Sequence, residues 1–279
     1  MYKITLAQRE DMDFLIKMAR QEGWNPGLTD GECLFAADPE GFFIGWLDNE
    51  PIACISAVKY DGFGFVGLYI VREGYRGRGY GLEIWCRAME HLSGDDLNIG
   101  LDGVPQRQAD YMKSGFRFYH RNLRYGGRIT GFIPNCRGIE EASPVDFEKI
   151  KTYYRRYFPA QREDFLQKWL FAAGHRALIR KQAGEITGLG VIRTCVDGYK
   201  IGPLFAEDQE TAQGIFEALA APLQGENIYI DLLEGNALAD WLRQKHGLGR
   251  IFENARMYTK EQPGLKWDNV YGITTFELG

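Results

Sequence analysis

Three alternating glycines beside two arginines form the segment of this sequence with the clearest chemistry. Gly77, Gly79 and Gly81 follow Arg76, and Arg78 lies between the first two glycines. An apolar strand-like run precedes the segment and a helix-like pattern follows it, so the glycines lie at the mouth of a helix. The helix N-terminus offers unpaired N–H groups with partial positive charge, and glycine lets an anion approach them closely. The pattern predicts an anion cradle suited to a pyrophosphate.

Two familiar phosphate-binding motifs do not fit this segment. The dinucleotide fingerprint GxGxxG fails because, counting from Gly77, its third glycine position holds Leu82. The Walker loop GxxxxGK[ST] is absent as well. The sequence does match Arg-x-x-Gly-x-Gly at Arg76, Gly79 and Gly81. A glycine-rich surface turn is the alternative interpretation, and the strand before the segment and the helix after it favour the cradle.

Hydrophobic periodicity predicts alternating strands and helices in the first half of the chain. The order is β-α-α-β-β-β-α-β-α-β. Strands are expected at 3–6, 42–47, 52–60, 65–71, 97–101 and from Phe116; helices are expected from Met12, from about Asp30, after the glycines and at about 106–114. In the helix after the glycines, we expect one apolar face made of Leu82, Trp85, Met89 and Leu92.

A similar order starts again in the second half, which indicates a diverged duplication. Strands are expected near 137–141 and at 176–180, 186–194, 199–205, 227–232 and from Arg250, with helices at 144–157, 161–173, 208–221 and 236–245. The matching segments are Ala109–Met112 with Ala239–Leu242, Gly115-Phe116 with Gly247-Leu248, and Asn122-x-Arg124 with Asn254-x-Arg256. We therefore predict two domains, 1–134 and 135–279, with a linker near Ile133–Arg137.

These motifs resemble the GNAT superfamily of N-acetyltransferases. The likeness rests on Arg76-x-x-Gly79-x-Gly81, on the element order, and on Tyr111 four residues before Gly115-Phe116. It implies a mixed α/β (α+β) fold of two tandem GNAT-like domains, each a mostly antiparallel twisted sheet flanked by helices. It also implies acetyl-CoA as cosubstrate and no metal. The first domain would be the catalytic one, with the pyrophosphate on Arg76, Gly77, Arg78, Gly79 and Gly81.

The resemblance assigns two further roles near the thioester. An N–H of Ile70 or Val71 would stabilise the oxyanion of a tetrahedral intermediate. Tyr111 would protonate the departing CoA thiolate, because a phenol is neutral at pH 7 and can donate to developing charge. A tyrosine that only packs beside the CoA arm stays an alternative. The asparagine often found before this tyrosine is absent, and the sequence there reads Val104-Pro105-Gln106-Arg107.

The acceptor side is marked by fewer signals. Trp24, Asn25 and Asp30 lie between the first two helices, where GNAT proteins usually cover the acceptor, so Trp24 could pack on it and the polar pair could bind an amine. Core packing, turn formation and helix capping would explain the same residues equally well. No general base stands out. The carboxylates near the expected cleft are Glu73, Asp61 and Asp102, each as readily a surface group, and a water chain could serve instead.

The second half has no counterpart of the cradle. Opposite the glycine segment it carries Ala206–Thr211, without glycine and with three acids, which would repel a pyrophosphate. Trp241 stands where Tyr111 does, and an indole N–H is a poor acid. This half resembles the YitH/HolE-type C-terminal GNAT domain, on Lys200–Leu204 and Val270–Glu277. We expect a degenerate domain that shapes the acceptor mouth or binds a metabolite or partner.

Composition restricts the remaining possibilities. The 279 residues carry a formal charge of −5, which disfavours nucleic acid and anionic membranes as partners. Cys33, Cys54, Cys86, Cys136 and Cys195 form no CxxC pair and the four histidines no HxH or HxxxH, so neither a disulfide framework nor a zinc site is expected. The N-terminus lacks an apolar signal region, so we expect a cytoplasmic protein.

These observations together predict an acetyl-CoA-dependent N-acetyltransferase that acts on a primary amine of a small molecule. A non-catalytic acyl-CoA sensor is the competing hypothesis, and a protein-lysine acceptor is a third. A homodimer is compatible with the sequence. Tyr111 separates the first two hypotheses, because a sensor has no need of a proton donor.

Overall fold

The structure is a computed structural model that describes all of residues 1–279. Its thirteen strands form one sheet with the order β1-β2-β3-β4-β5-β12-β6-β11-β10-β9-β8-β7, and β13 pairs with β10. The strands are β1 (Tyr2–Leu6), β2 (Phe42–Leu47), β3 (Glu50–Tyr60), β4 (Phe63–Val71), β5 (Asn98–Gly103), β6 (Arg117–Arg128), β7 (Ile139–Glu141), β8 (His175–Gln182), β9 (Glu185–Thr194), β10 (Tyr199–Ala206), β11 (Asn227–Leu233), β12 (Gly249–Tyr258) and β13 (Val270–Gly272).

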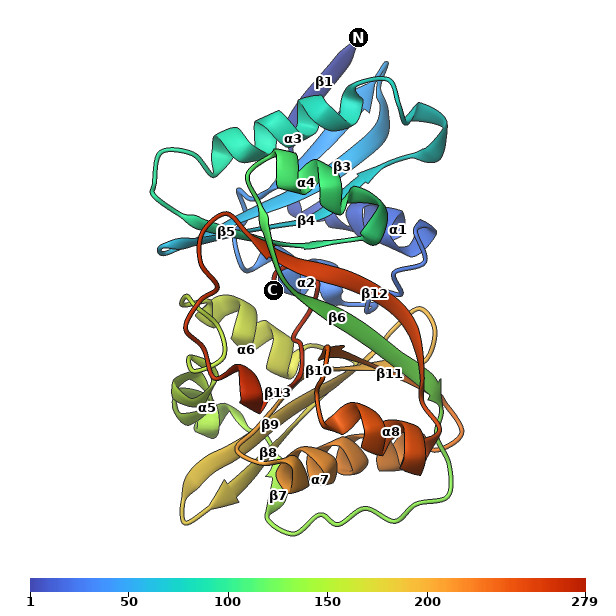
Figure 1. The fold of residues 1–279 in the computed structure, drawn as a ribbon, viewed down its shortest axis with the longest axis vertical. Coiled ribbons are helices and arrows are strands. Elements are labelled where there is room, and N and C mark those ends of the chain that lie inside the picture. The colour runs from blue at the N-terminus through green and yellow to red at the C-terminus, as the bar shows by residue number, and fades with distance from the viewer.

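Eight α-helices cover the sheet (Figure 1). They are α1 (Met12–Gln21), α2 (Asp30–Phe35), α3 (Tyr80–His91), α4 (Gln108–Lys113), α5 (Phe147–Tyr154), α6 (Glu163–Phe171), α7 (Gln209–Ala220) and α8 (Leu238–His246). Only the β4·β5 and β10·β11 pairs are parallel, and the other pairs are antiparallel. The predicted fold class is therefore confirmed, with each half repeating the same element order.

The two halves exchange strands at their junction. The C-terminal strand β12 lies between β5 and β6, and β6 in turn pairs with β11 of the second half. Figure 1 shows β6 and β12 side by side across the middle of the molecule. Asn122 and Asn254, which the sequence comparison matched, are direct neighbours in this pair. The sheet of each half is thus completed by a strand from the other.

Two buried ion pairs join the exchanged strands to their new neighbours. Arg256 on β12 binds both carboxylate oxygens of Asp102 on β5 at 2.7 and 2.8 Å. Arg124 on β6 binds Asp231 on β11 in the same bidentate way at 2.6 and 2.9 Å. Burial opposes the charge of Arg124, but Asp231 outweighs it and raises the pKa of the guanidinium. Because each pair links one half to the other, the ion pairs fix the exchange.

The apolar core also crosses between the halves. The largest cluster of buried side chains contains Leu15 and Phe65 from the first half together with Trp169 and Phe205 from the second. A second cluster lies under α3 and includes Met257 of β12. Burial of this apolar area is the main force that holds the chain together. The two halves therefore share one packed core rather than forming two domains joined only by a linker.

The buried face of α3 differs from the prediction. Ile84, Ala88 and Leu92 are buried at four-residue spacing, whereas the predicted face member Leu82 is 66% exposed. A stripe at i, i+4 and i+8 faces the sheet. Trp85 and Met89 of the predicted face pack against the margin of the same cluster, and only Leu82 turns away from it. Leu82 lies instead on the wall of the cavity described below. The prediction of that helix face was wrong for Leu82, because an apolar wall of a ligand site has the same pattern as a core.

The Arg256 ion pair gives a direct test of the exchange. Arg256→Met leaves the buried Asp102 carboxylate without its cation, so we expect the free energy of unfolding to fall by about 3–5 kcal/mol in denaturant titrations. The double variant Arg256→Met with Asp102→Leu removes both charges and should recover at least half of the loss. A single variant that unfolds like the wild type would contradict a structural role for this pair.

Candidate active site

The parallel strands β4 and β5 separate halfway along their length. They pair only from Phe63 to Val66, and β12 pairs with the edge of β5 that faces away from β4. A bulge accompanies the separation: the register with β3 shifts between Cys54 and Ser56, and Leu68 adopts a φ of +45°. Bulges re-aim strands in this way next to ligand sites. As a result, residues 67–71 keep an edge that β5 does not cover.

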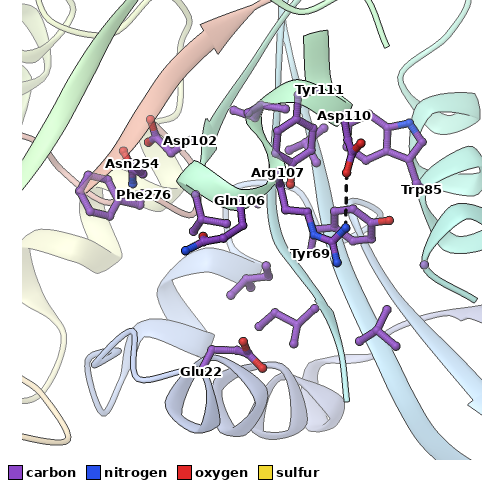
Figure 2. Close-up of a pocket in the computed structure, with 18 of the residues that line it drawn as sticks. Glu22, Tyr69, Trp85, Asp102, Gln106, Arg107, Asp110, Tyr111, Asn254 and Phe276 are labelled. Carbon is purple, nitrogen blue, oxygen red and sulfur yellow. Dashed lines mark hydrogen bonds and ion pairs between the residues drawn. The ribbon is translucent and has the colours of Figure 1, made fainter. Parts of the chain in front are cut away.

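A cavity of about 790 Å³ occupies the opening between these strands. Its walls come from the free edge of β4, the glycine loop, α3 and α4, and from four residues of the second half. Those four are Phe252, Asn254, Phe276 and Glu277. Figure 2 shows Asp102, Asn254 and Phe276 at one end of the cavity and Tyr69, Trp85 and Tyr111 toward the other. A volume of this size suits a small ligand or part of a larger one.

The glycine loop has the geometry of an anion cradle. Gly77 and Gly79 have φ values of +74° and +91°, which L side chains rarely adopt, and open space surrounds the position of a Cβ at each. Gly79 is the N-cap of α3, and no side chain caps this helix end. The first amides of α3 are therefore available to a ligand. Gly77, Gly79 and Gly81 all line the cavity.

The two arginines of the loop lie differently. Arg76 lines the cavity, where its Nε donates to the Val71 carbonyl at 2.7 Å and its Nη2 donates to the Glu22 carboxylate. Arg78 does not line the cavity; its guanidinium lies 5.9 Å from the ring centre of Tyr75. Only Arg76 therefore stands where the sequence analysis places a cationic partner of the ligand.

Tyr111 lies on α4 with its ring in an aromatic cluster at the cavity wall. Its ring centre is 5.5 Å from Trp85 and 6.4 Å from Phe116. Glycine is required opposite, because a Cβ on Gly103 would lie 2.9 Å from the tyrosine ring. Burial, and then the charge of Tyr69, raise the pKa of Tyr111 above that of a free phenol. The hydroxyl thus keeps its proton at neutral pH.

Of the three residues considered for the acceptor, only Trp24 lines the cavity. The Asn25 side chain instead exchanges hydrogen bonds of 2.9 and 2.8 Å with the backbone of Asp197. Asp30 is 2% exposed and binds Nε of Arg193 at 2.9 Å and the amide of Gly27 at 2.7 Å. Both polar residues connect the first half to the second, which corrects their expected position at the acceptor. An interface contact so distant along the chain leaves no local signal in the sequence.

The candidate bases differ in their positions. Asp102 lines the cavity, but Arg256 occupies both of its oxygens. Asp61 and Glu73 are exposed and do not line the cavity. The sequence analysis did not name the four lining residues of the second half as site residues. The signals available for them were the matched Asn-x-Arg segment at Asn254 and the family-typical closing segment that ends at Glu277.

The equivalent opening in the second half is filled. Strands β10 and β11 pair in parallel only from Tyr199 to Ile201, as β4 and β5 do over a short stretch. Beyond that point β13 pairs with β10, at Leu204 and Phe205. Asp208 is the N-cap of helix α7, and its carboxylate accepts a hydrogen bond from the Thr211 amide at 2.7 Å. The helix end opposite the glycine loop is therefore capped by an acid and its strand edge is covered.

Comparison with known proteins agrees with this architecture. The acetyltransferase (GNAT) family model matches residues 8–121, and an acetyltransferase (GNAT) domain model matches residues 150–272. A protein of Pseudoalteromonas sp. (strain SANK 73390) named holothin acyltransferase is 30% identical over 275 residues, which cover 98% of this chain and 93% of that protein. The chain belongs to the GNAT acetyltransferase family. It is a tandem GNAT acyltransferase.

Solved structures show the same fold. A crystal structure from Pyrococcus horikoshii, described as an acetyltransferase, matches with a TM-score of 0.81 and 24% identity over 100% of this chain and 96% of that one. A tandem GNAT protein from the clavulanic acid biosynthesis pathway matches with a TM-score of 0.62 and 12% identity, covering 94% of this chain and 100% of that one. Both likenesses extend over the two halves together, so the tandem arrangement belongs to the shared fold.

Two further observations describe the whole chain. No group of three or more His, Cys, Asp or Glu side chains is arranged to hold a metal ion. None of the helices has the length and apolar character that crossing a membrane requires.

Gly79 offers a test of the cradle with an internal control. Gly79 and Gly94 lie beyond the two ends of α3 with φ values of +91° and +93°, and a Cβ at either position would meet no atom within 4 Å. Alanine at either site therefore adds similar backbone strain. We expect Gly79→Ala to weaken acetyl-CoA binding at least tenfold, about 1.4 kcal/mol, in calorimetry, and Gly94→Ala to leave it unchanged. Equal affinities for the two variants would remove the loop from the binding site.

Proposed function

We propose that this acyltransferase uses acetyl-CoA and transfers the acetyl group directly to a primary amine of a small molecule. The observation that carries the proposal is that the glycine loop, the free edge of β4 and Tyr111 all line one cavity. In this cavity the glycine loop lies at α3, the free edge of β4 along one side, and Tyr111 beside that edge. A pyrophosphate on the loop and a thioester beside residues 67–71 would bring the reacting carbonyl close to Tyr111 and to the residues of the second half.

The chain's own groups would then divide the reaction between them. Arg76, Gly77, Gly79 and Gly81 would hold the pyrophosphate. Residues Ile70 and Val71 of the β4 edge line the cavity, and one of their N–H groups would donate to the oxygen of the tetrahedral intermediate. Preorganised donors of this kind act where water is excluded and cost no rearrangement during the reaction.

The bond changes balance without a further reactant. The neutral amine attacks the thioester carbonyl carbon and a C–N bond forms. The nitrogen then loses one proton to solvent, and the C–S bond breaks. The departing thiolate takes a proton from Tyr111, which recovers one from solvent. Because burial raises the pKa of Tyr111, the phenol is protonated at the start of each cycle. Acetylated amine and CoA are the products.

The shape of the cavity favours a small acceptor over a protein lysine. Phe252, Asn254 and Phe276 of the second half line the same cavity as the β4 edge, so the chain itself supplies a wall for the acceptor. A relative that matches over the full length bears the name holothin acyltransferase, which supports a dedicated acceptor. An acyl-CoA sensor would need the loop but neither Tyr111 nor this second wall.

Tyr111→Phe tests the proton-donor role. We expect kcat for release of CoA thiol from acetyl-CoA, measured with a panel of primary amines, to fall by about 10²–10³ because the thiolate loses its acid. Acetyl-CoA affinity should stay the same. Tyr125→Phe is the matched control, since Tyr125 lies outside the cavity lining.

The raised pKa adds a pH signature to the same assay. The wild type should show no loss of rate from Tyr111 ionisation below about pH 10, the pKa of a free phenol. If the Tyr111→Phe variant reacts at the wild-type rate, Tyr111 has only a packing role and is not the proton donor. If the wild type binds acetyl-CoA tightly but releases no CoA thiol with any amine, the acyl-CoA sensor would be the correct hypothesis and the enzyme the wrong one.

A further inference from the structure

Four carboxylates line the cavity, and three of them already have cationic partners. Glu22 is bound by Arg76, Asp102 by Arg256, and Asp110 by Arg107 at 3.4 Å and Lys113 at 3.6 Å. The fourth, Glu277, forms no salt bridge with any residue of the chain. It is also 8% exposed, which is unusual for an unpaired acid. An unpaired, nearly buried carboxylate on a cavity wall is suited to receive a cation from a ligand.

Glu277 lies at the start of the free β4 edge. A Cβ on Gly67 would lie 2.2 Å from the Glu277 carbonyl oxygen, so the C-terminal tail packs directly on the first residue beyond the β4·β5 pairing. The end of the tail is fixed by Arg162, which donates to the Leu278 carbonyl at 3.2 Å and to the Gly279 carbonyl at 3.0 Å. The tail therefore holds Glu277 on the strand along which the thioester would lie.

The carboxylate of Glu277 is only partly satisfied. Its Oε2 accepts a hydrogen bond from the Thr275 hydroxyl, and its Oε1 has no hydrogen-bond partner in the chain. The charged groups that its charge influences are Arg124 on β6, Arg193 on β9 and Asp102 on β5. Each of these three is engaged elsewhere, with Asp231, Asp30 and Arg256 respectively. One oxygen of Glu277 is thus left for a ligand.

The surroundings of Glu277 describe the rest of that ligand. Trp24, Phe252 and Phe276 line the same cavity, and the two phenylalanine rings are 6.2 Å apart. Asn254 lies beside Phe276 in Figure 2, and its side-chain oxygen Oδ1 already accepts a hydrogen bond from Nδ2 of Asn122 at 2.8 Å. Aromatic walls favour flat apolar bodies. The acceptor end therefore combines one anionic oxygen with an aromatic wall.

We propose that Glu277 binds the ammonium of the acceptor and accepts its proton, and that the acceptor is a primary amine on an aromatic or similarly flat apolar body. This inference rests on the proposed acetyl transfer and names its base and its acceptor class. One N–H proton moves from the ammonium to Oε1 of Glu277, directly or through one water. The freed lone pair then attacks the thioester carbonyl, and the nitrogen of the tetrahedral intermediate loses its second proton to solvent. Glu277 later returns the first proton to solvent.

This assignment gives the second half a part in the chemistry. Its own groove is filled by β13, and the chain that leaves β13 continues into the tail that carries Phe276 and Glu277. The segment that fills one groove therefore delivers the acceptor-side groups to the other.

Glu277→Gln tests the proposal with little change in shape. The probes are 2-phenylethylamine, ethylamine, which lacks the ring, and 2-phenylethanol, which lacks the ammonium. We expect kcat/KM for 2-phenylethylamine at neutral pH to fall by about 10²–10³ in Glu277→Gln. The loss should shrink as the pH approaches about 10, where the free amine no longer needs a base. Acetyl-CoA affinity should be unchanged, which verifies folding.

Further variants separate the base from other effects of the change. Glu185→Gln, an exposed residue of the same half, makes the same change of charge away from the cavity and should behave as wild type. Glu277→Asp keeps the carboxylate and should retain the wild-type pH profile at reduced rate. In the wild type, 2-phenylethylamine should be preferred over ethylamine at least tenfold, because only the former contacts the aromatic wall.

Titration of the amine into the protein–CoA complex distinguishes this proposal from the proposed function. Glu277→Gln should lose at least tenfold in affinity for 2-phenylethylamine and nothing for 2-phenylethanol. Amine binding that depends on Glu277 without any thiol release would support the subsite and overturn acetyl transfer. Wild-type turnover and a wild-type pH profile in Glu277→Gln would overturn the base role. Equal use of ethylamine and 2-phenylethylamine would overturn the acceptor class. If the wild type shows no amine binding and no turnover, the whole inference is overturned.

Discussion

The exchange of β12 into the sheet of the first half is the constraint on which the active-site cavity depends. β12 pairs with the edge of β5 that faces away from β4 and brings Phe252 and Asn254 to the cavity, while β4 keeps an edge from residue 67 to 71 that β5 does not cover. The ion pair of Arg256 with Asp102 holds β12 in that place, and the pair of Arg124 with Asp231 holds the reciprocal strand β6. Removing one partner of a buried ion pair is costly, because it leaves an uncompensated buried charge. The open groove is therefore a product of both halves.

The two halves share one fold and differ in what occupies the splayed strands. In the first half the opening between β4 and β5 forms the cavity, and glycines leave the helix end at α3 open to a ligand. In the second half β13 covers the strand edge, and Asp208 caps α7. The chain thus holds one open groove and one closed one. The closed half contributes Phe252, Asn254, Phe276 and Glu277 to the open groove.

The features that the sequence could predict are those with local signals. Strand and helix order follow from hydrophobic period, and the alternating glycines indicate the loop between β4 and α3. The exchange of strands could not be predicted, because Asn122 and Asn254 read as a mere repeat until they are seen as neighbours. Asn25 and Asp30 were expected at the acceptor for the same reason: their partners Asp197 and Arg193 lie far along the chain. The roles of the loop residues and Tyr111 stay predictions.

Calorimetric titration of the intact protein with acetyl-CoA tests the central claim, that one groove is open and the other is closed, most directly. Two intact GNAT grooves would give two sites per chain, whereas coverage of the β10 edge by β13 leaves one. We expect a stoichiometry of one acetyl-CoA per chain, abolished by changes in the glycine loop. A stoichiometry of two would contradict the account, because it would require β13 to leave β10 and the Asp208 cap to admit a pyrophosphate.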